Sequence, residues 1–278
     1  MKALAGIIGL TICAFNSAVA EPLPGVIVPE TLGSPTFQET FRTLDAGPDL
    51  GPSSPGRHRW RTILKNSDPD HAKDARSLST NTWFGDQSDG AGSSPFALTS
   101  RGLVITATRQ AQPSGRSWRS GVLTTKFSFS QMYGYFEFFA DLPACVKAAW
   151  PGLWLMPEKA GWPRGGEIDA PETIGDGKVY WTAISGATGG KTQRQITSAA
   201  DCTRTLHRYG VLWRPDRIGY YYDRHLVGGA PTPPDYDSPM YLLIDLNVGG
   251  GWPGQPDPAL RQVSMTIDHV AAWPLKAP

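Results

Sequence analysis

The sequence reads GEIDAPETIG at residues 166–175, and this stretch decides the fold because its acids follow the spacing of a β-strand. Side chains two residues apart in a strand share a face, so Glu167 and Asp169 point the same way. Glu172 would face the other way in a regular strand, because it lies an odd number of residues after Glu167. A β-bulge adds one residue and restores the parity, and Pro171, which cannot donate a ladder hydrogen bond, is tolerated at a bulge. The stretch therefore predicts a bulged strand with three carboxylates on one face.

An acidic strand face is usually a solvated surface, so the surroundings decide between that interpretation and a functional site. Ile168, Ala170 and Ile174 alternate with the acids, and an apolar run that contains Trp150 and Trp154 precedes them at residues 149–157. Indole faces stack on the C–H faces of pyranose rings, so acids that face a tryptophan-rich wall favour a sugar-binding cleft.

Paired carboxylates of this kind are the working groups of most glycoside hydrolases. The two groups lie about 5–5.5 Å apart in retaining enzymes and about 6.5–9.5 Å apart in inverting ones. Asp169 lies between Glu167 and Glu172 in the sequence, where its charge would raise the proton affinity of its neighbours or where it would share a proton with one of them. One glutamate could then stay protonated as an acid while the other stays ionised as a nucleophile.

The signature Glu-x-Asp-x-x-Glu formed by Glu167, Asp169 and Glu172 resembles that of glycoside hydrolase family 16, the β-glucanase, laminarinase and agarase group. The resemblance covers about residues 37 to 275. Further segments match in family order: 120–125, 133–138, 142–143, 207–216, 220–223, 242–250, 252–254 and 267–270. It implies an all-β jelly-roll sandwich of two antiparallel sheets with a concave substrate cleft, and hydrolysis with retention. Glu167 would be the nucleophile, Glu172 the acid/base and Asp169 the assisting acid.

The chain departs from the family pattern at three places that bear on the substrate. Asp245 stands where asparagine is commoner, Ala170-Pro171 replaces a larger apolar pair, and residues 180–185 lack the histidine of many laminarinase-like members. Of the ten tryptophans, Trp60 and Trp213 are expected in the core. The candidates for contact with sugar are Trp150, Trp154, Trp162, Trp181 and Trp252.

Composition and targeting signals limit the domain organisation, the localisation and the partners that we expect. The 278 residues, with 31 Gly, 25 Pro and 40% hydrophobic content, suit one large β domain, which we expect at residues 37–278. Residues 1–20 read as a signal peptide cut after Ala20, which predicts a secreted or periplasmic protein, and residues 21–36 read as a flexible Pro-rich leader. Removing Lys2 from the 26 basic residues leaves 26 − 1 = 25 against 25 acidic ones, so we expect neither nucleic acid nor membrane as a partner of the mature chain.

Two cysteines remain after the signal peptide, Cys145 and Cys202, and an even pair in an exported protein predicts a disulfide, with two buried thiols as the alternative. No Cys/His spacing resembles a metal site, so we expect no metal and no cofactor; a structural calcium ion is conceivable, but no ligand cluster indicates one. We also expect a monomer.

Three functions stay open at this point. The first is a secreted retaining endo-β-glycanase that hydrolyses internal bonds of a polysaccharide, with β-1,3- or mixed β-1,3/1,4-glucan as the expected substrate. The second is a depolymerase or transglycosylase that acts on a bacterial exopolysaccharide. The third is a non-catalytic carbohydrate-binding protein, which would usually lack one of the three acids.

Overall fold

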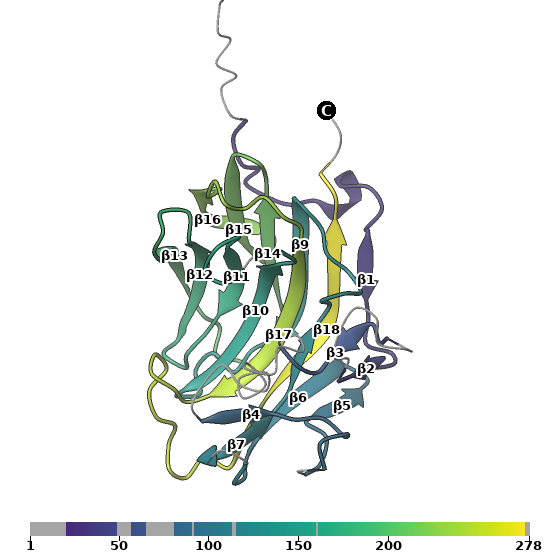
Figure 1. Ribbon diagram of the computed structural model, residues 1–278, viewed down its shortest axis with the longest axis vertical. Coiled ribbons are helices and arrows are strands. Elements are labelled where there is room, and N and C mark those ends of the chain that lie inside the picture. Colours follow the sequence, from purple (N-terminus) through teal and green to yellow (C-terminus); the bar gives the residue numbers. More distant parts are fainter. Residues whose placement is uncertain are drawn as a thin grey trace, which may run out of the picture.

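Two β-sheets packed face to face form the protein in a computed structural model that describes residues 21–48, 57–64, 81–90, 92–112, 115–159 and 161–275 (Figure 1). The only helical turn in these ranges is the short η1 (Pro29–Thr31). None of the described segments forms a helix with the length and apolar character needed to cross a membrane. The expected signal peptide at residues 1–20 lies outside the described residues.

The ten-stranded sheet follows the order β16-β15-β14-β9-β18-β6-β7-β4, with β1 paired to β18 and β5 to β6. Its strands are β1 (Phe37–Glu39), β4 (Thr82–Phe84), β5 (Phe96–Thr99), β6 (Gly102–Arg109), β7 (Trp118–Ser120), β9 (Gly134–Asp141), β14 (His207–Trp213), β15 (Arg217–Tyr222), β16 (His225–Pro231) and β18 (Gln262–Trp273).

The eight-stranded sheet follows the order β13-β12-β11-β10-β17-β8-β3-β2. Its strands are β2 (Ala46–Gly47), β3 (Trp60–Arg61), β8 (Val122–Thr124), β10 (Ala149–Pro157), β11 (Glu167–Glu172), β12 (Lys178–Ser185), β13 (Thr192–Ala199) and β17 (Met240–Val248). The long strands β10 and β17 are neighbours and curve together through the middle of the sheet (Figure 1).

The all-β sandwich is thus confirmed, but the sheets are mixed rather than purely antiparallel. β2 pairs with β3 in parallel, and β4 pairs with β7 in parallel. Both parallel pairs lie at the end of their sheet's strand order. Neither pair is a hairpin, because residues 48–59 separate β2 from β3 and residues 85–117 separate β4 from β7.

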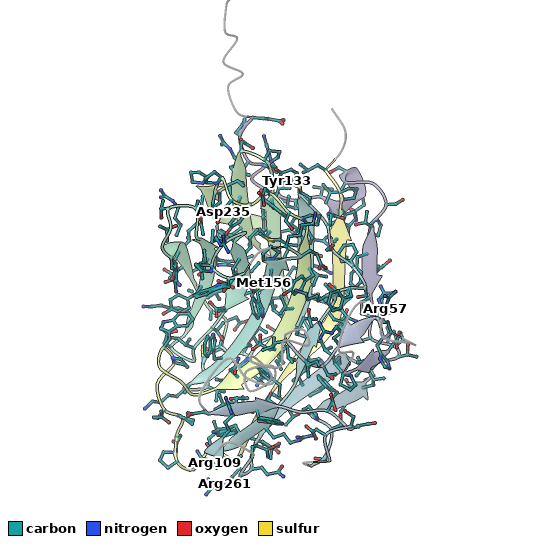
Figure 2. The ribbon with its side chains drawn as sticks, viewed as in Figure 1. Arg57, Arg109, Tyr133, Met156, Asp235 and Arg261 are labelled. Atoms are coloured by element: carbon teal, nitrogen blue, oxygen red, sulfur yellow. A yellow bond between two sulfur atoms is a disulfide. The ribbon has the colours of Figure 1, made fainter. Side chains whose placement is uncertain are left out.

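The core fills the space between the sheets with alternate residues of each long strand. In β10, Ala149, Leu153 and Leu155 belong to this core, whereas Trp150 and Trp154 point to the opposite face of the sheet. Trp60 and Trp213 are fully buried in the same core, as expected from the sequence. Figure 2 shows the side chains of the described residues along the strands of both sheets. The remaining, outer face of the eight-stranded sheet is where the acids of β11 lie.

The segment at residues 21–36, expected to be a flexible leader, instead packs on the outer face of the ten-stranded sheet, and that expectation is wrong. Ile27 is buried in a cluster with Tyr135, Tyr221 and Trp273. The backbone N–H of Ile27 donates to the carbonyl oxygen of Arg224 at 2.9 Å, and the Tyr221 hydroxyl donates to that of Pro24 at 2.9 Å. The segment has no strand alternation, but its few apolar side chains find an apolar patch that distant strands create.

The disulfide between Cys145 and Cys202 is present, with Cα atoms 5.5 Å apart. Cys145 lies between β9 and β10, and Cys202 lies between β13 and β14. The bond therefore joins two loops that each cross from one sheet to the other, near the start of β10.

Candidate active site

The predicted bulge lies in the middle of β11. Asp169 pairs with Thr182 and Glu172 with Tyr180 on β12, so three steps along β11 match two along β12. The same shift occurs against β10, where Asp169 pairs with Trp154 and Glu172 with Gly152. The extra residue brings Glu167, Asp169 and Glu172 to the outer face of the sheet, while Ile168 and Ala170 stay in the core.

The start of β11 is fixed by Tyr236, which sequence reasoning did not identify. Its hydroxyl donates to the carbonyl oxygens of Glu167 at 2.6 Å and Ile184 at 2.8 Å. Gly166 precedes the strand with φ of 90°, and a side chain there would overlap the Tyr236 ring. A glycine is therefore required at the point where the first acid enters the strand.

Glu172 accepts a hydrogen bond from the indole N–H of Trp150, with 2.7 Å between Nε1 and Oε1. Burial raises the pKa of Glu172 to about 8; the Trp150 hydrogen bond opposes this rise, and the negative charge of Glu167 adds to it. A carboxyl group with this pKa is mostly protonated at neutral pH, which is the state of a general acid.

Glu167 accepts a hydrogen bond from the indole N–H of Trp162, with 2.6 Å between Nε1 and Oε2. Burial raises the pKa of Glu167, and three interactions act against that rise: the Trp162 hydrogen bond, a hydrogen bond with Asp169 and the charge of Lys191. Lys191 itself lies over the Trp162 ring at 5.5 Å from the centroid. Glu172 also accepts an indole N–H and also feels the charge of Lys191, so the hydrogen bond with Asp169 is the contact that favours the ionised state of Glu167 relative to that of Glu172.

Asp169 is buried between the two glutamates. Burial raises its pKa well above the usual range, and the charges of Glu172 and Glu167 and a hydrogen bond to Glu167 add to the effect. The raised pKa favours the protonated form of Asp169, in which its carboxyl group can donate the hydrogen bond to Glu167.

A fourth carboxylate, that of Asp245 on β17, belongs to the same site, and sequence reasoning noted it only as a departure from the family. It accepts hydrogen bonds from Trp154 Nε1 at 2.7 Å and from Asn247 Nδ2 at 2.6 Å. The signal that could have found it is the alternation of β17: Leu242, Ile244 and Leu246 lie in the core, so the residues between them face outward.

The tryptophans expected to contact sugar divide into three groups. Trp252 and Trp162 are the exposed ones, at 42% and 51% of their surface, and Trp252 packs edge-on against the partly buried Trp150 at 5.8 Å between ring centroids. Trp154 faces the site but is only 7% exposed, and its indole N–H donates a hydrogen bond to Asp245.

Trp181 is fully buried in the core between the sheets, so its expected place at the site is wrong. Side chains alternate along β12, and the register pairs Glu172 with Tyr180, so Tyr180 takes the outer face and Trp181 the inner one. The Tyr180 ring packs against Trp252 at 5.0 Å between centroids.

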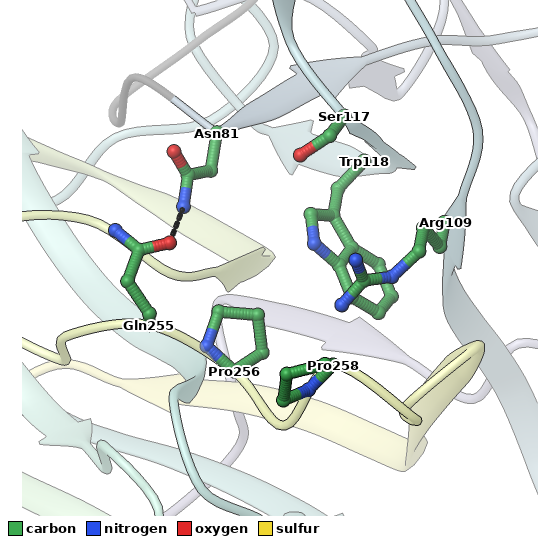
Figure 3. A pocket seen from close by; sticks show the side chains of 7 residues that line it. All are labelled: Asn81, Arg109, Ser117, Trp118, Gln255, Pro256 and Pro258. Atoms are coloured by element: carbon green, nitrogen blue, oxygen red, sulfur yellow. Dashed lines mark hydrogen bonds between the residues drawn. The ribbon is translucent and has the colours of Figure 1, made fainter.

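No group of His, Cys, Asp and Glu side chains that could hold a metal ion occurs among the residues that the structure describes. A cavity of about 240 Å³ lies elsewhere, lined by Asn81, Arg109, Ser117, Trp118, Gln255, Pro256 and Pro258 (Figure 3). Arg109 spans it to donate to the carbonyl oxygens of Leu260 and Asp257, and none of the four carboxylates lines it. This cavity belongs to the packing of the loop before β18 rather than to the site.

The fold and the site are those of a jelly-roll protein of the glycoside hydrolase class. The model of the family "Glycosyl hydrolases family 16" matches residues 80–271. The chain therefore belongs to glycosyl hydrolase family 16.

Relatives of known sequence support this membership. Over 196 residues, or 67% of this chain and 41% of the relative, it is 40% identical to the endo-1,3-1,4-beta-glycanase EglC of Rhizobium meliloti. It is 38% identical to the endo-1,3-1,4-beta-glycanase ExsH of the same organism, over 66% of this chain and 40% of the relative. The chain thus spans about two fifths of the length of these relatives.

The laminarinase catalytic domain from Thermotoga maritima shares the fold, with a TM-score of 0.69 and 24% identity over 88% of this chain and 99% of that domain. The laminarinase from Rhodothermus marinus gives a TM-score of 0.67 at 24% identity, over 87% of this chain and 98% of that one.

Proposed function

We propose that the protein is a secreted or periplasmic retaining endo-β-glycanase that hydrolyses internal bonds of a β-1,3- or mixed β-1,3/1,4-linked glucan. The observation that carries the proposal is the division of labour between two buried glutamates on one bulged strand. The environment of Glu172 raises its pKa to about 8, while the hydrogen bond with Asp169, which Glu172 lacks, favours the charged form of Glu167. The names of the relatives, endo-1,3-1,4-beta-glycanases, support the choice of substrate.

In the first step, the Glu167 carboxylate attacks the anomeric carbon as Glu172 gives its proton to the leaving glycosidic oxygen. The bond between that oxygen and the anomeric carbon breaks, and an ester to Glu167 forms. Asp169, which donates a hydrogen bond to Glu167, holds the nucleophile in place and stabilises its charge until the ester forms.

In the second step, Glu172, now ionised, takes a proton from a water molecule that attacks the same carbon. The ester bond breaks and the carboxylate of Glu167 is restored. Two inversions at one carbon leave the β configuration unchanged, so the first product should be the β anomer. Proton NMR of the nascent reducing end measures this directly, and an initial α anomer would contradict the mechanism.

Exposed aromatic rings at both ends of the acidic row would hold the polysaccharide. Trp162 lies beside Glu167, and Trp252 lies beside Trp150, the partner of Glu172. The sugar ring that carries the scissile bond would then lie between two indole platforms, which suits a chain that extends past the site in both directions. This arrangement supports cleavage within a chain rather than at its end.

The experiment that tests the function is a reducing-end assay on β-glucans, agarose, carrageenan and bacterial exopolysaccharides. We expect turnover of a β-1,3- or mixed-linkage glucan. Azide should partly restore activity to a Glu167→Gly variant and yield the α-glycosyl azide, because a single displacement inverts the carbon. The same variant without azide is the control. Turnover of an exopolysaccharide alone would replace the substrate assignment, and binding without turnover of any polymer would overturn the proposal.

A further inference from the structure

The carboxylate of Asp245 shares the outer face of the sheet with the three acids of β11, although it comes from β17. The register places it opposite Gly152 of β10 and Val122 of β8. A side chain on Gly152 would lie 3.1 Å from Asp245 Oδ1 and 3.2 Å from Trp154 Cδ1. The bare backbone at this position lets the acid and the indole meet.

Both oxygens of the buried Asp245 carboxylate are held by neutral donors. Trp154 Nε1 donates to Oδ1 at 2.7 Å, and Asn247 Nδ2 donates to Oδ2 at 2.6 Å. Within the described part of the chain, no cation forms an ion pair with this carboxylate. Its negative charge is therefore stabilised by hydrogen bonds but not neutralised, and it acts on the groups around it.

Among the described residues, Glu167, Asp169 and Glu172 interact electrostatically with Asp245, and all three lie on β11. The neighbouring positions on β10 and β8 are Gly152, Trp154 and Val122, which carry no charge. Burial raises the pKa of Asp245 to about 7, the two hydrogen bonds oppose this, and the charge of Glu167 adds to it. Ionised Asp245 in turn raises the pKa of both Asp169 and Glu172, while the charge of Lys191 lowers that of Glu172.

We propose that Asp245 is a positioning residue whose negative charge keeps the proton on Glu172 and so extends the alkaline range in which Glu172 can act as an acid. The inference rests on the proposed function, because it assigns Asp245 a role in the step that Glu172 performs. In this role Asp245 touches neither the substrate nor the reacting atoms. Its charge acts electrostatically on the other acids on the outer face of the sheet.

The variant Asp245→Asn separates the charge from the packing. The amide has the shape of the carboxylate and keeps an oxygen to accept the Trp154 N–H. Asn247 Oδ1 is buried without a hydrogen-bond partner, so the Asn247 amide can turn and accept from the new amide nitrogen. The hydrogen bonds are thus preserved and only the charge is lost.

We expect the alkaline limb of kcat/KM against pH to move down by about one pH unit in Asp245→Asn, the lower end of the effect of a nearby charge. Activity on the acidic side of the optimum should change little. Asp237→Asn is the matched control, because Asp237 is exposed and lies in the loop before β17, outside the group of four acids. An unchanged alkaline limb in Asp245→Asn would overturn the proposal.

A titration that needs no turnover separates this inference from the proposed function. Carbon-13 NMR of labelled glutamate carboxyl groups, with the Glu172 signal assigned by its absence in Glu172→Gln, reports the midpoint of Glu172 directly. We expect a lower midpoint in Asp245→Asn than in the wild type. An equal midpoint overturns the role of Asp245 whatever the enzyme hydrolyses. A lowered midpoint in a protein that hydrolyses no polymer supports the electrostatic coupling and removes the proposed function alone.

A second variant keeps the test available if Asp245→Asn does not fold. Trp154→Phe retains an aromatic ring but removes the N–H that stabilises ionised Asp245. Asp245 should then be less ionised at neutral pH, so the Glu172 midpoint should fall in the same direction by a smaller amount. A Glu172 midpoint that stays the same or rises in Trp154→Phe would contradict the proposal.

Discussion

Buried carboxylates on the outer faces of the two sheets have opposite environments. On the ten-stranded sheet, Glu137 is fully buried and accepts hydrogen bonds from Arg224 at 2.8 and 3.0 Å and from Arg208 at 2.9 Å. On the eight-stranded sheet, Glu172 has an indole N–H as its hydrogen-bond donor and other carboxylates as charged neighbours.

The pKa values of the two glutamates therefore move in opposite directions. Burial alone would raise the pKa of Glu137, but the hydrogen bonds and charges of Arg224 and Arg208 outweigh it and lower the value. For Glu172 burial prevails. Burial of a carboxyl group by itself therefore does not mark an active site. A buried acid without a cation costs stability, and such an acid is retained where a proton must be stored.

The largest expected effect is on turnover by the acids of β11. Glu172→Gln and Glu167→Gln should each lower kcat by at least about a thousandfold, because each removes a proton carrier or a nucleophile. The melting temperature should stay at or above that of the wild type, because Glu172→Gln resembles the protonated carboxyl that Glu172 mostly carries at neutral pH, and Glu167→Gln removes a charge from a crowded acidic group. Initial rates on the preferred glucan and calorimetry measure the two effects. Activity near that of the wild type in either variant would refute the catalytic assignment.

Substitution of two tryptophans, one in the core and one at the candidate active site, should affect different properties of the protein. Trp181→Ala should lower the free energy of unfolding by about 3–5 kcal/mol, because Trp181 is fully buried between the sheets. Trp252→Ala should instead raise KM and leave the melting temperature almost unchanged, because its ring is largely exposed beside the acids. Denaturant unfolding and saturation kinetics on both variants distinguish the roles. Equal destabilisation by both would show that Trp252 is also a packing residue.

On the opposite sheet, Glu137→Gln should mainly affect stability. It leaves two arginines without their anion, at an expected cost of up to about 3 kcal/mol, reduced by the access of both guanidinium groups to water. Turnover of the folded fraction should match that of the wild type. The measurement is urea unfolding, with the activity corrected for the amount of folded protein. A loss of kcat without a loss of stability would show that Glu137 takes part in turnover.

The pH dependence of stability should have opposite signs for the two acids. The pKa of Glu172 is raised from 4.5 to about 8 in the folded protein, so the folded state keeps a proton that the unfolded state releases. Its contribution to the free energy of unfolding therefore decreases as pH rises from 4.5 to about 8. The contribution of Glu137, whose pKa is lowered, is present above its ordinary value of 4.5 and is lost on acidification.

Melting temperatures measured across this pH range test both signs. Relative to the wild type, Glu172→Gln should gain stability as pH rises, and Glu137→Gln should lose less stability in acid than at neutral pH. A Glu172→Gln curve parallel to that of the wild type would mean that Glu172 titrates as an ordinary surface acid.

The sequence predicted those features that depend on local parity. The bulge between Asp169 and Glu172 follows from an odd spacing and a proline. The disulfide follows from the even pair of cysteines after the expected signal peptide. Each of these needs no knowledge of which strands lie side by side.

The features that were missed depend on register and on distant contacts. Tyr180 and Trp181 alternate, and only the pairing of β12 with β11 decides which of them faces the acids. The place of Ile27 depends on an apolar patch built by β9, β15 and β18, which no pattern within residues 21–36 reveals. The hydrogen bond from Trp162 to Glu167 arises from a loop whose path has no periodicity.

The bulge in β11 makes the parity of this segment matter more than its exact length. Loss of one codon between Asp169 and Glu172 would remove the extra residue, and a regular strand with the resulting even spacing would still carry all three carboxylates on the outer face. A conservative replacement at Ala170, whose side chain only packs, would leave all three carboxylates where they are. In genetic terms this strand should tolerate many missense changes at its inward positions, and a one-codon deletion at the bulge better than a two-codon deletion.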